Sequence, residues 1–117
     1  MTVKHTDDIP SENVSAGSMT KKQVLIGPDE GKNFAMRRFT IQPGGGMPLH
    51  TNTVEHEQYV LRGQARIRIG DDEYEVSAGN VIFIPQNVQH SYSAFGEEPF
   101  EFICIIPNLP DTISLVE

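Results

Sequence analysis

The chain has 117 residues, enough for one domain with a hydrophobic core but not for two. Its formal net charge of −7 argues against binding to nucleic-acid phosphates, and no apolar run reaches the length of a membrane span. The single cysteine, Cys104, excludes an internal disulfide framework and a thiolate metal cluster. The N-terminus lacks the apolar stretch of a signal peptide, so the sequence predicts a cytoplasmic protein.

The first twenty residues are polar and are interrupted by serine and glycine. We expect residues 1–20 to form an N-terminal arm or edge strand, and residues 21–117 to form a single β-domain. Phe34 to Ile41 has the composition of a strand and is expected to end at Pro43, before three glycines.

Further along the chain, short apolar segments alternate with turns. Tyr59 to Leu61 leads into Gly63, and Ala65 to Ile69 alternates apolar and charged residues before the turn at residues 70–72, which is typical of a β-hairpin. Val81 to Ile84 stops at Pro85, and Phe100 to Ile106 stops at Pro107. No segment has a helical period with caps, so the pattern predicts an all-β sandwich or barrel.

Three of the four histidines, His50, His56 and His90, follow glycine-rich or proline-containing turns. Neutral imidazole is a common ligand for first-row transition metals. A set of three that leaves coordination positions open is typical of a metal used for chemistry rather than for structure. Strand alternation places Asn52 on the same face as His50, so a barrel is expected to gather these side chains around one ion.

These residues resemble the two motifs of the cupin family. In the first motif, Gly44 is followed after five residues by His50, Asn52 stands in place of the second histidine, and His56 stands in place of the glutamate; Gly63 closes the segment. In the second motif, Gly79, Pro85 and His90 match in register. Asn87 there replaces a glycine and Ala94 an asparagine.

The resemblance implies a double-stranded β-helix, or jelly-roll barrel, with a divalent metal inside. Glu55-His56-Glu57 and the following Val60-Leu61-Arg62-Gly63 look most like small single-domain cupins whose four histidines bind manganese. Three imidazoles also resemble the iron sites of cupin dioxygenases. Manganese or iron is therefore expected, with zinc, nickel and copper left open.

The expected metal ligands are His50, Asn52, His56 and His90. Asn52 offers only an amide oxygen, a weak ligand for softer ions, and alternatively holds a water molecule or orients a substrate. Glu57 replaces His56 as the donor if the loop is shifted by one residue. The remaining histidine, His5, is expected to be exposed on the arm.

Phe102 and Cys104 share one strand face and are expected to line the pocket, although Cys104 also fits the role of a small buried apolar residue. Arg37, Arg66 and Arg68 are expected to be exposed, with one of them a candidate carboxylate anchor at the barrel mouth.

Three functions fit this set of residues. The first is an iron- or manganese-dependent, dioxygenase-like oxidoreductase acting on a small molecule. The second is a non-catalytic binding or sensor module, and the third is a scaffold with a vestigial site. The resemblance also implies a homodimer, in which residues 1–20 and the tail Ile113-Ser114-Leu115-Val116 are candidates for strand exchange.

Overall fold

The computed structural model describes residues 1–117. Its regular secondary structure is almost entirely β-strand, which confirms the all-β prediction. Besides one 3₁₀ turn, η1 (Thr6–Asp8), it contains β1 (Glu12–Asn13), β2 (Ser18–Ile26), β3 (Phe34–Asn52), β4 (His56–Arg62), β5 (Gln64–Ile69), β6 (Asp72–Ser77), β7 (Val81–Ile84), β8 (His90–Phe95), β9 (Phe100–Pro107) and β10 (Ile113–Leu115). No helix is long and apolar enough to cross a membrane.

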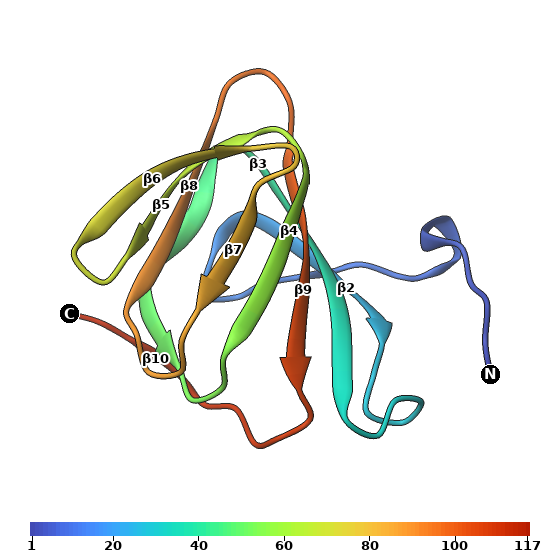
Figure 1. Cartoon of the computed structure of the whole chain (residues 1–117). Coiled ribbons are helices and arrows are strands. Elements are labelled where there is room, and N and C mark those ends of the chain that lie inside the picture. Colours follow the sequence, from blue (N-terminus) through green and yellow to red (C-terminus); the bar gives the residue numbers. More distant parts are fainter.

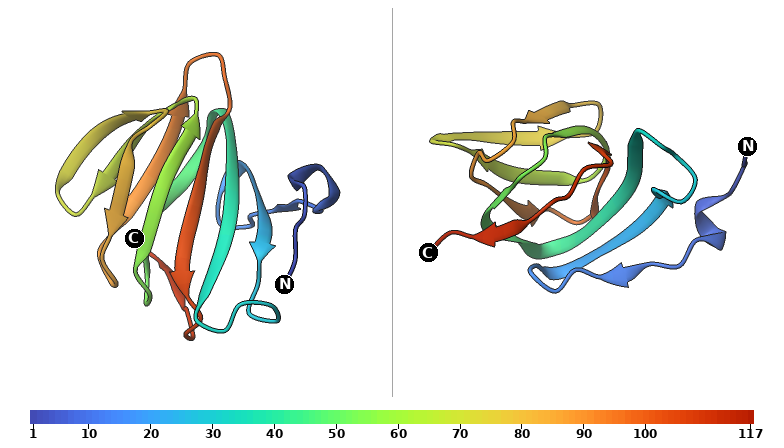
Figure 2. Two further views of the ribbon diagram at one scale, coloured as in Figure 1. Left: turned by 45° about the vertical axis from the view of Figure 1, so that its right-hand side comes forward. Right: turned by 90° about the horizontal axis from the view of Figure 1, so that it is seen from below.

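The strands form one antiparallel sheet that curls on itself (Figures 1 and 2). Along the sheet the strands follow the order β6-β5-β8-β3-β9-β4-β7, and β2 and β10 add to β3. The expected barrel is thus built, with β6 and β7 as the two edges that do not pair with each other. An apolar groove lined by Tyr74, Val76, Ile82 and Phe83 lies along this seam.

β3 is longer than the sequence pattern predicted, because it continues past Pro43 and the three glycines to Asn52. The glycines bend the strand rather than end it. Gly44 has a φ of +88°, and a Cβ on Gly46 would lie 2.1 Å from the carbonyl oxygen of Tyr92. Glycine therefore lets β3 cross very close to β8, and this crossing carries the strand into the candidate site.

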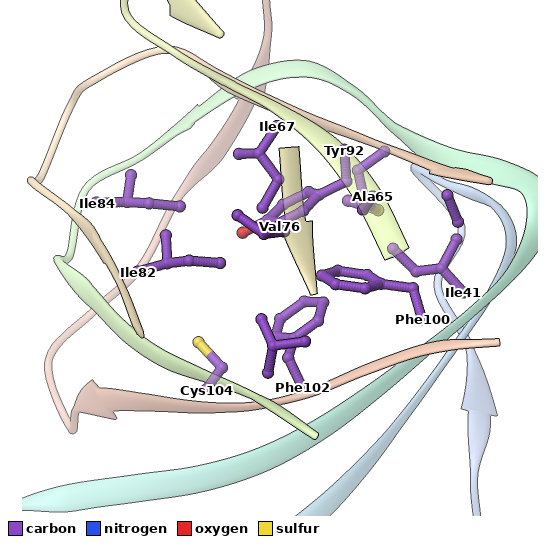
Figure 3. Packing of buried hydrophobic residues seen from close by; sticks show 13 residues of the cluster. Ile41, Ala65, Ile67, Val76, Ile82, Ile84, Tyr92, Phe100, Phe102 and Cys104 are labelled. Carbon is purple, nitrogen blue, oxygen red and sulfur yellow. The ribbon is translucent and has the colours of Figure 1, made fainter. Parts of the chain in front are cut away.

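The inward faces of the strands make one hydrophobic core (Figure 3). β4 and β5 alternate buried and exposed residues, as a strand with one face in a core must. Phe100 and Phe102 pack against each other in the centre, with ring centroids 5.3 Å apart and ring planes inclined by 42°. The buried cluster comprises Ile41, Met47, Val60, Ala65, Ile67, Val76, Ile82, Ile84, Tyr92, Ala94, Phe100, Phe102 and Cys104.

Both ends of the chain pair with the chain's own sheet. β1 pairs with β2, so the expected boundary after residue 20 falls inside β2, and only the first eleven residues precede the first strand. At the other end, β10 pairs with β3, with Ile113 opposite Asn52 and Leu115 opposite His50. The two segments considered for strand exchange thus have partners within one chain.

Candidate functional site

The fold brings together the three histidines singled out in the sequence. His50 and His90 are direct cross-strand partners between β3 and β8, and their ring centroids lie 4.1 Å apart. His56, the first residue of β4, approaches His90 with a centroid separation of 5.8 Å. All three side chains are buried, with exposed fractions of 3%, 6% and 1% for His50, His56 and His90.

Two of these imidazoles are held by the backbone. His50 donates from Nδ1 to the carbonyl oxygen of Pro48 at 2.7 Å, and His90 donates from Nδ1 to the carbonyl oxygen of Val88 at 2.9 Å. Because a carbonyl oxygen can only accept, the proton lies on Nδ1 in both rings, which leaves Nε2 with its lone pair. Nε2 of His90 is buried and has no hydrogen-bond partner.

His56 is held differently, by the thiol of Cys104. Its Nδ1 lies 3.4 Å from the Cys104 Sγ, and its Nε2 is buried without a partner. The same sulfur accepts from Arg37 Nη2 at 3.3 Å and from Gln58 Nε2 at 3.6 Å. Burial raises the pKa of the Cys104 thiol, so the sulfur here is a neutral contact for the imidazole.

Asn52 lies beside the histidines as strand alternation predicted, with 7% of its surface exposed. Its Nδ2 donates to Asp111, at 3.2 Å and 3.4 Å to the two carboxylate oxygens. Asp111 also accepts from the backbone N–H of Thr53. This contact fixes the direction of the amide, and its Oδ1 is a buried acceptor without a partner. An orphaned buried acceptor is costly unless a cation or donor fills the space before it.

Burial keeps the three imidazoles neutral. Desolvation is the largest cause of the lowered pKa of each, and it takes the pKa of His56 to about 3 and that of His90 to about 4. The guanidinium of Arg37 lowers the His56 pKa further. Neutral imidazole is the form that binds a metal ion, so these rings can bind one without first releasing a proton.

The three imidazoles and the Asn52 amide oxygen suit a divalent transition metal, although their side chains are not arranged around one point. No three His, Cys, Asp or Glu side chains already form a finished metal-binding group. Two imidazoles bound to one ion through Nε2 have ring centroids at most about 6.5 Å apart, given a metal–nitrogen bond of about 2.1 Å. The separations of 4.1 Å and 5.8 Å lie within that limit. The observation that such an ion explains is the set of buried polar atoms without partners, namely Nε2 of His56, Nε2 of His90 and Oδ1 of Asn52.

The histidines form one wall of a cavity of about 360 Å³, a volume at the lower end of small-molecule sites. Apolar and aromatic side chains line much of the rest, with a few polar groups among them. The lining residues are Glu12, Asn13, Val14, Ser15, Ala16, Lys22, Arg37, Phe39, Met47, His50, Asn52, His56, Gln58, His90, Tyr92, Phe102, Asp111 and Ile113.

Of the two pocket residues expected from β9, only Phe102 lines the cavity. Cys104 is fully buried behind the wall, where its thiol touches His56, Arg37 and Gln58. Cys104 keeps the inward direction that strand alternation gives it, as Phe102 does, but its thiol is covered by these three side chains. Cys104 therefore contacts the site through the ring of His56.

The alternative donor Glu57 points outward. β4 alternates strictly, with His56 and Gln58 buried and Glu57 exposed. A hydrogen bond with Glu55 is the first cause of the raised pKa of Glu57, to about 7, so these two carboxyl groups interact with each other on the surface. The register of β4 therefore gives the inward position to His56.

Three polar cavity residues that contact the site, Gln58, Tyr92 and Asp111, were not singled out in the sequence. Gln58 and Tyr92 each follow a histidine by two residues on the same strand face, so alternation alone would have found them. They hydrogen-bond each other at 2.8 Å, deep in the wall. Asp111 carries no such signal, because it comes from a loop far along the chain. Arg37 was one of three arginines expected to be exposed, of which one was a candidate carboxylate anchor, and its side chain lines the cavity.

The chain belongs to the cupin family, since the family model described as "Cupin domain" matches residues 37–106. Among solved structures, the polyketide cyclase RemF from Streptomyces resistomycificus superposes with a TM-score of 0.88 at 28% identity. That match covers 100% of this chain and 87% of the cyclase. A cupin-2 domain protein from Rhodospirillum rubrum, at 21% identity and a TM-score of 0.84, shares the fold.

Two curated relatives are much longer proteins. The mannose-1-phosphate guanylyltransferase RfbM of Salmonella typhimurium is 36% identical over 77 residues, which are 64% of this chain. The oxalate decarboxylase OxdC of Bacillus subtilis is 30% identical over 78 residues. The matches span only 16% and 20% of the lengths of those enzymes.

Proposed function

We propose that this cupin is a metal-dependent enzyme whose centre consists of His50, His56 and His90, with Asn52 as a weaker fourth ligand. The main supporting observation is the set of buried nitrogen and oxygen atoms without hydrogen-bond partners on His56, His90 and Asn52 at the cavity wall. Manganese or iron is the expected metal, and zinc, nickel and copper also suit imidazole ligands. When bound, such an ion polarises a carbonyl or other oxygen of the substrate, or activates dioxygen.

The substrate we propose is a small molecule that presents two neighbouring oxygens, such as a β-dicarbonyl compound. Neutral ligands leave the full charge of a divalent ion to attract such a chelating group. The likeness to a polyketide cyclase over nearly the whole of both chains supports carbonyl chemistry of this kind. Oxidation by O₂, as in a dioxygenase, is the alternative reaction at the same centre, because three imidazoles leave room for a further ligand.

The chain's own residues would hold and enclose the substrate. Phe39, Phe102 and Tyr92 provide an apolar wall, with Phe102 stacked at 5.1 Å on Phe39 and at 5.3 Å on Tyr92. Residues 12–16 also line the cavity, and a bound substrate packed between them and the aromatic wall would displace water. Both effects strengthen polar interactions between the substrate and the centre.

Metal analysis of the purified protein tests the centre. We expect close to one equivalent of a transition metal in the wild type, and a loss of most of it in His56→Ala and in His90→Ala. His5→Ala is the matched control, since His5 is exposed, caps η1 and does not line the cavity. Less than about a tenth of an equivalent in the wild type, under conditions in which histidine sites fill, would refute the proposal.

A second function, metal-dependent binding without turnover, is favoured by one observation. Burial lowers the pKa of all three histidines and raises that of Tyr92, so none of these cavity groups exchanges a proton near neutral pH. Acetylacetone, a simple β-dicarbonyl compound, separates the possibilities. Oxygen uptake indicates oxidation, conversion without oxygen uptake indicates carbonyl chemistry, and binding with neither indicates a binding module.

We also propose that the protein is a homodimer, as its resemblance to small cupins implies. The outer faces of β4 and β7 support this, because Tyr59, Val81 and Phe83 expose 51%, 77% and 55% of their surfaces and make an apolar patch. Sedimentation equilibrium should give twice the chain mass of 13.0 kDa. A mass equal to one chain would contradict the proposal.

A further inference from the structure

We propose that Arg37 is the anion-binding residue of the cavity, and that the natural ligand is an organic acid anion with an aromatic or conjugated body. The proposal deepens the proposed function, since it specifies the substrate class of the same cavity. It begins from the position of Arg37 on β3, opposite Cys104 on β9, with its side chain in the cavity wall.

The Arg37 guanidinium has no carboxylate partner in the structure. The structure contains five ion pairs, and none of them includes Arg37. Its Nη2 donates only to the thiol of Cys104, and its Nε is buried without any partner. A guanidinium has five N–H donors in a rigid fork, so most of its hydrogen-bonding capacity is unused. A partly buried charge in this state is unfavourable unless a ligand supplies the counter-charge.

The other charged groups of the cavity wall are already occupied. Lys22 pairs with Glu12 at 3.6 Å, and Asp111 accepts from Asn52 and from the backbone of Thr53. The neighbouring arginine, Arg38, lies on the opposite face of β3 and pairs with Glu101 at 2.8 Å. Arg37 alone is therefore free to receive an anion that enters the cavity.

The surroundings of Arg37 indicate the rest of the ligand. Its guanidinium lies 5.0 Å from the centre of the Phe39 ring, and Phe39 continues through Phe102 to Tyr92 as a stack of nearly parallel rings, each pair inclined by 12°. A flat conjugated body suits this wall. Arg37 and His56 also contact the same atom, the Cys104 Sγ, at 3.3 Å and 3.4 Å, so they are neighbours in the wall. One ligand can thus place an acidic oxygen on Arg37 while another oxygen faces the histidines.

Salicylate and its neutral amide, salicylamide, are suitable probes, because they share a ring and a phenol and differ in the charged group. Calorimetry on metal-free protein isolates Arg37 from the charge of any ion. We expect the wild type to bind salicylate at least about tenfold more tightly than salicylamide, as a charge-assisted pair requires. Arg37→Gln should remove this preference, and Arg37→Lys should retain part of it.

Arg66→Gln is the control, since Arg66 is exposed on the outside of the sheet and pairs with Glu75. It should leave both affinities unchanged. The proposal is overturned if Arg37→Gln binds salicylate as tightly as the wild type, or if the wild type does not discriminate between the probes at millimolar concentration. The wild-type comparison remains decisive if the Arg37 variants do not fold.

A repeat with metal-loaded protein separates this proposal from the proposed function. If the wild type binds no metal, the metal centre fails while the Arg37 preference in the metal-free protein still stands. If the protein binds metal but Arg37→Gln has no effect in either form, the centre stands and the anion site fails.

Discussion

The metal-free protein should lose stability between pH 8 and pH 5 because two buried imidazoles resist protonation. The folded-state pKa values of His56 and His90 are about 3 and about 4, below the ordinary value of 6.5. The unfolded chain therefore binds protons at these positions over a range in which the folded chain does not. By linkage, the free energy of unfolding falls as the pH drops below about 6.5, and continues to fall until each folded-state pKa is reached.

The size of the effect follows from the same values. At pH 5 each of the two histidines should remove about 2 kcal/mol relative to pH 8, so together they remove about 4 kcal/mol. A domain of this length has a total stability of about 6 to 18 kcal/mol, so the loss is a large share. Glu57 acts in the opposite direction, since its pKa is raised, but its side chain is exposed and solvent screens its contribution.

Urea unfolding of protein treated with a chelator measures this difference directly. His56→Asn and His90→Asn should each reduce the pH 8 to pH 5 difference by about 2 kcal/mol, because each removes one titrating group. His5→Asn should leave it unchanged, since His5 is exposed. If neither buried-site variant alters the difference by more than about 0.5 kcal/mol, the imidazoles are not neutral and desolvated as described.

Three further results are expected. Gly46→Ala should destabilise the fold by more than about 2 kcal/mol and weaken metal binding, because the added Cβ meets the Tyr92 carbonyl oxygen 2.1 Å away and pushes His50 from His90; normal metal affinity would contradict the close crossing. Asp111→Ala should lower metal affinity about 10- to 100-fold in a competition titration, since Asp111 orients Asn52, and an unchanged affinity would exclude Asn52 as a ligand. Phe100→Ala should cost about 3–5 kcal/mol in urea unfolding with unaltered metal content in the folded protein, because Phe100 is fully buried and does not line the cavity.

The fold was largely predictable because strand alternation and turn residues are local signals. The hairpin of β5 and β6 and the bounds of β7 follow directly from them. Asn87 explains why the second motif keeps its spacing although one of its glycines is replaced. It stands where the motif has glycine and adopts a φ of +64°, a conformation that asparagine tolerates better than most residues. The length of β3 was missed, because a proline and three glycines normally end a strand.

The site was predictable only where its residues lie at fixed spacing on a strand. The three histidines and Asn52 come from motif positions, and the structure brings them together. Asp111 depends on how distant segments pack, so no local pattern reveals it, and the pattern did not decide which of Arg37, Arg66 and Arg68 enters the cavity. Cys104 lies on the strand face that alternation predicts and is a small buried residue, but the side chains of Arg37, Gln58 and His56 lie over its thiol, which no local pattern reveals.

The contrast between the Nδ1 partners of the histidines has a consequence for how such a site can change. His50 and His90 rest on the carbonyl oxygens of Pro48 and Val88, and no side-chain replacement elsewhere can remove those acceptors. His56 rests on the side chain of Cys104, which a single substitution or an oxidation alters. The orientations of His50 and His90 are therefore preserved when other side chains are substituted. A substitution at Cys104 can alter the orientation of His56, so adaptation of the site to a new ligand is most easily achieved there.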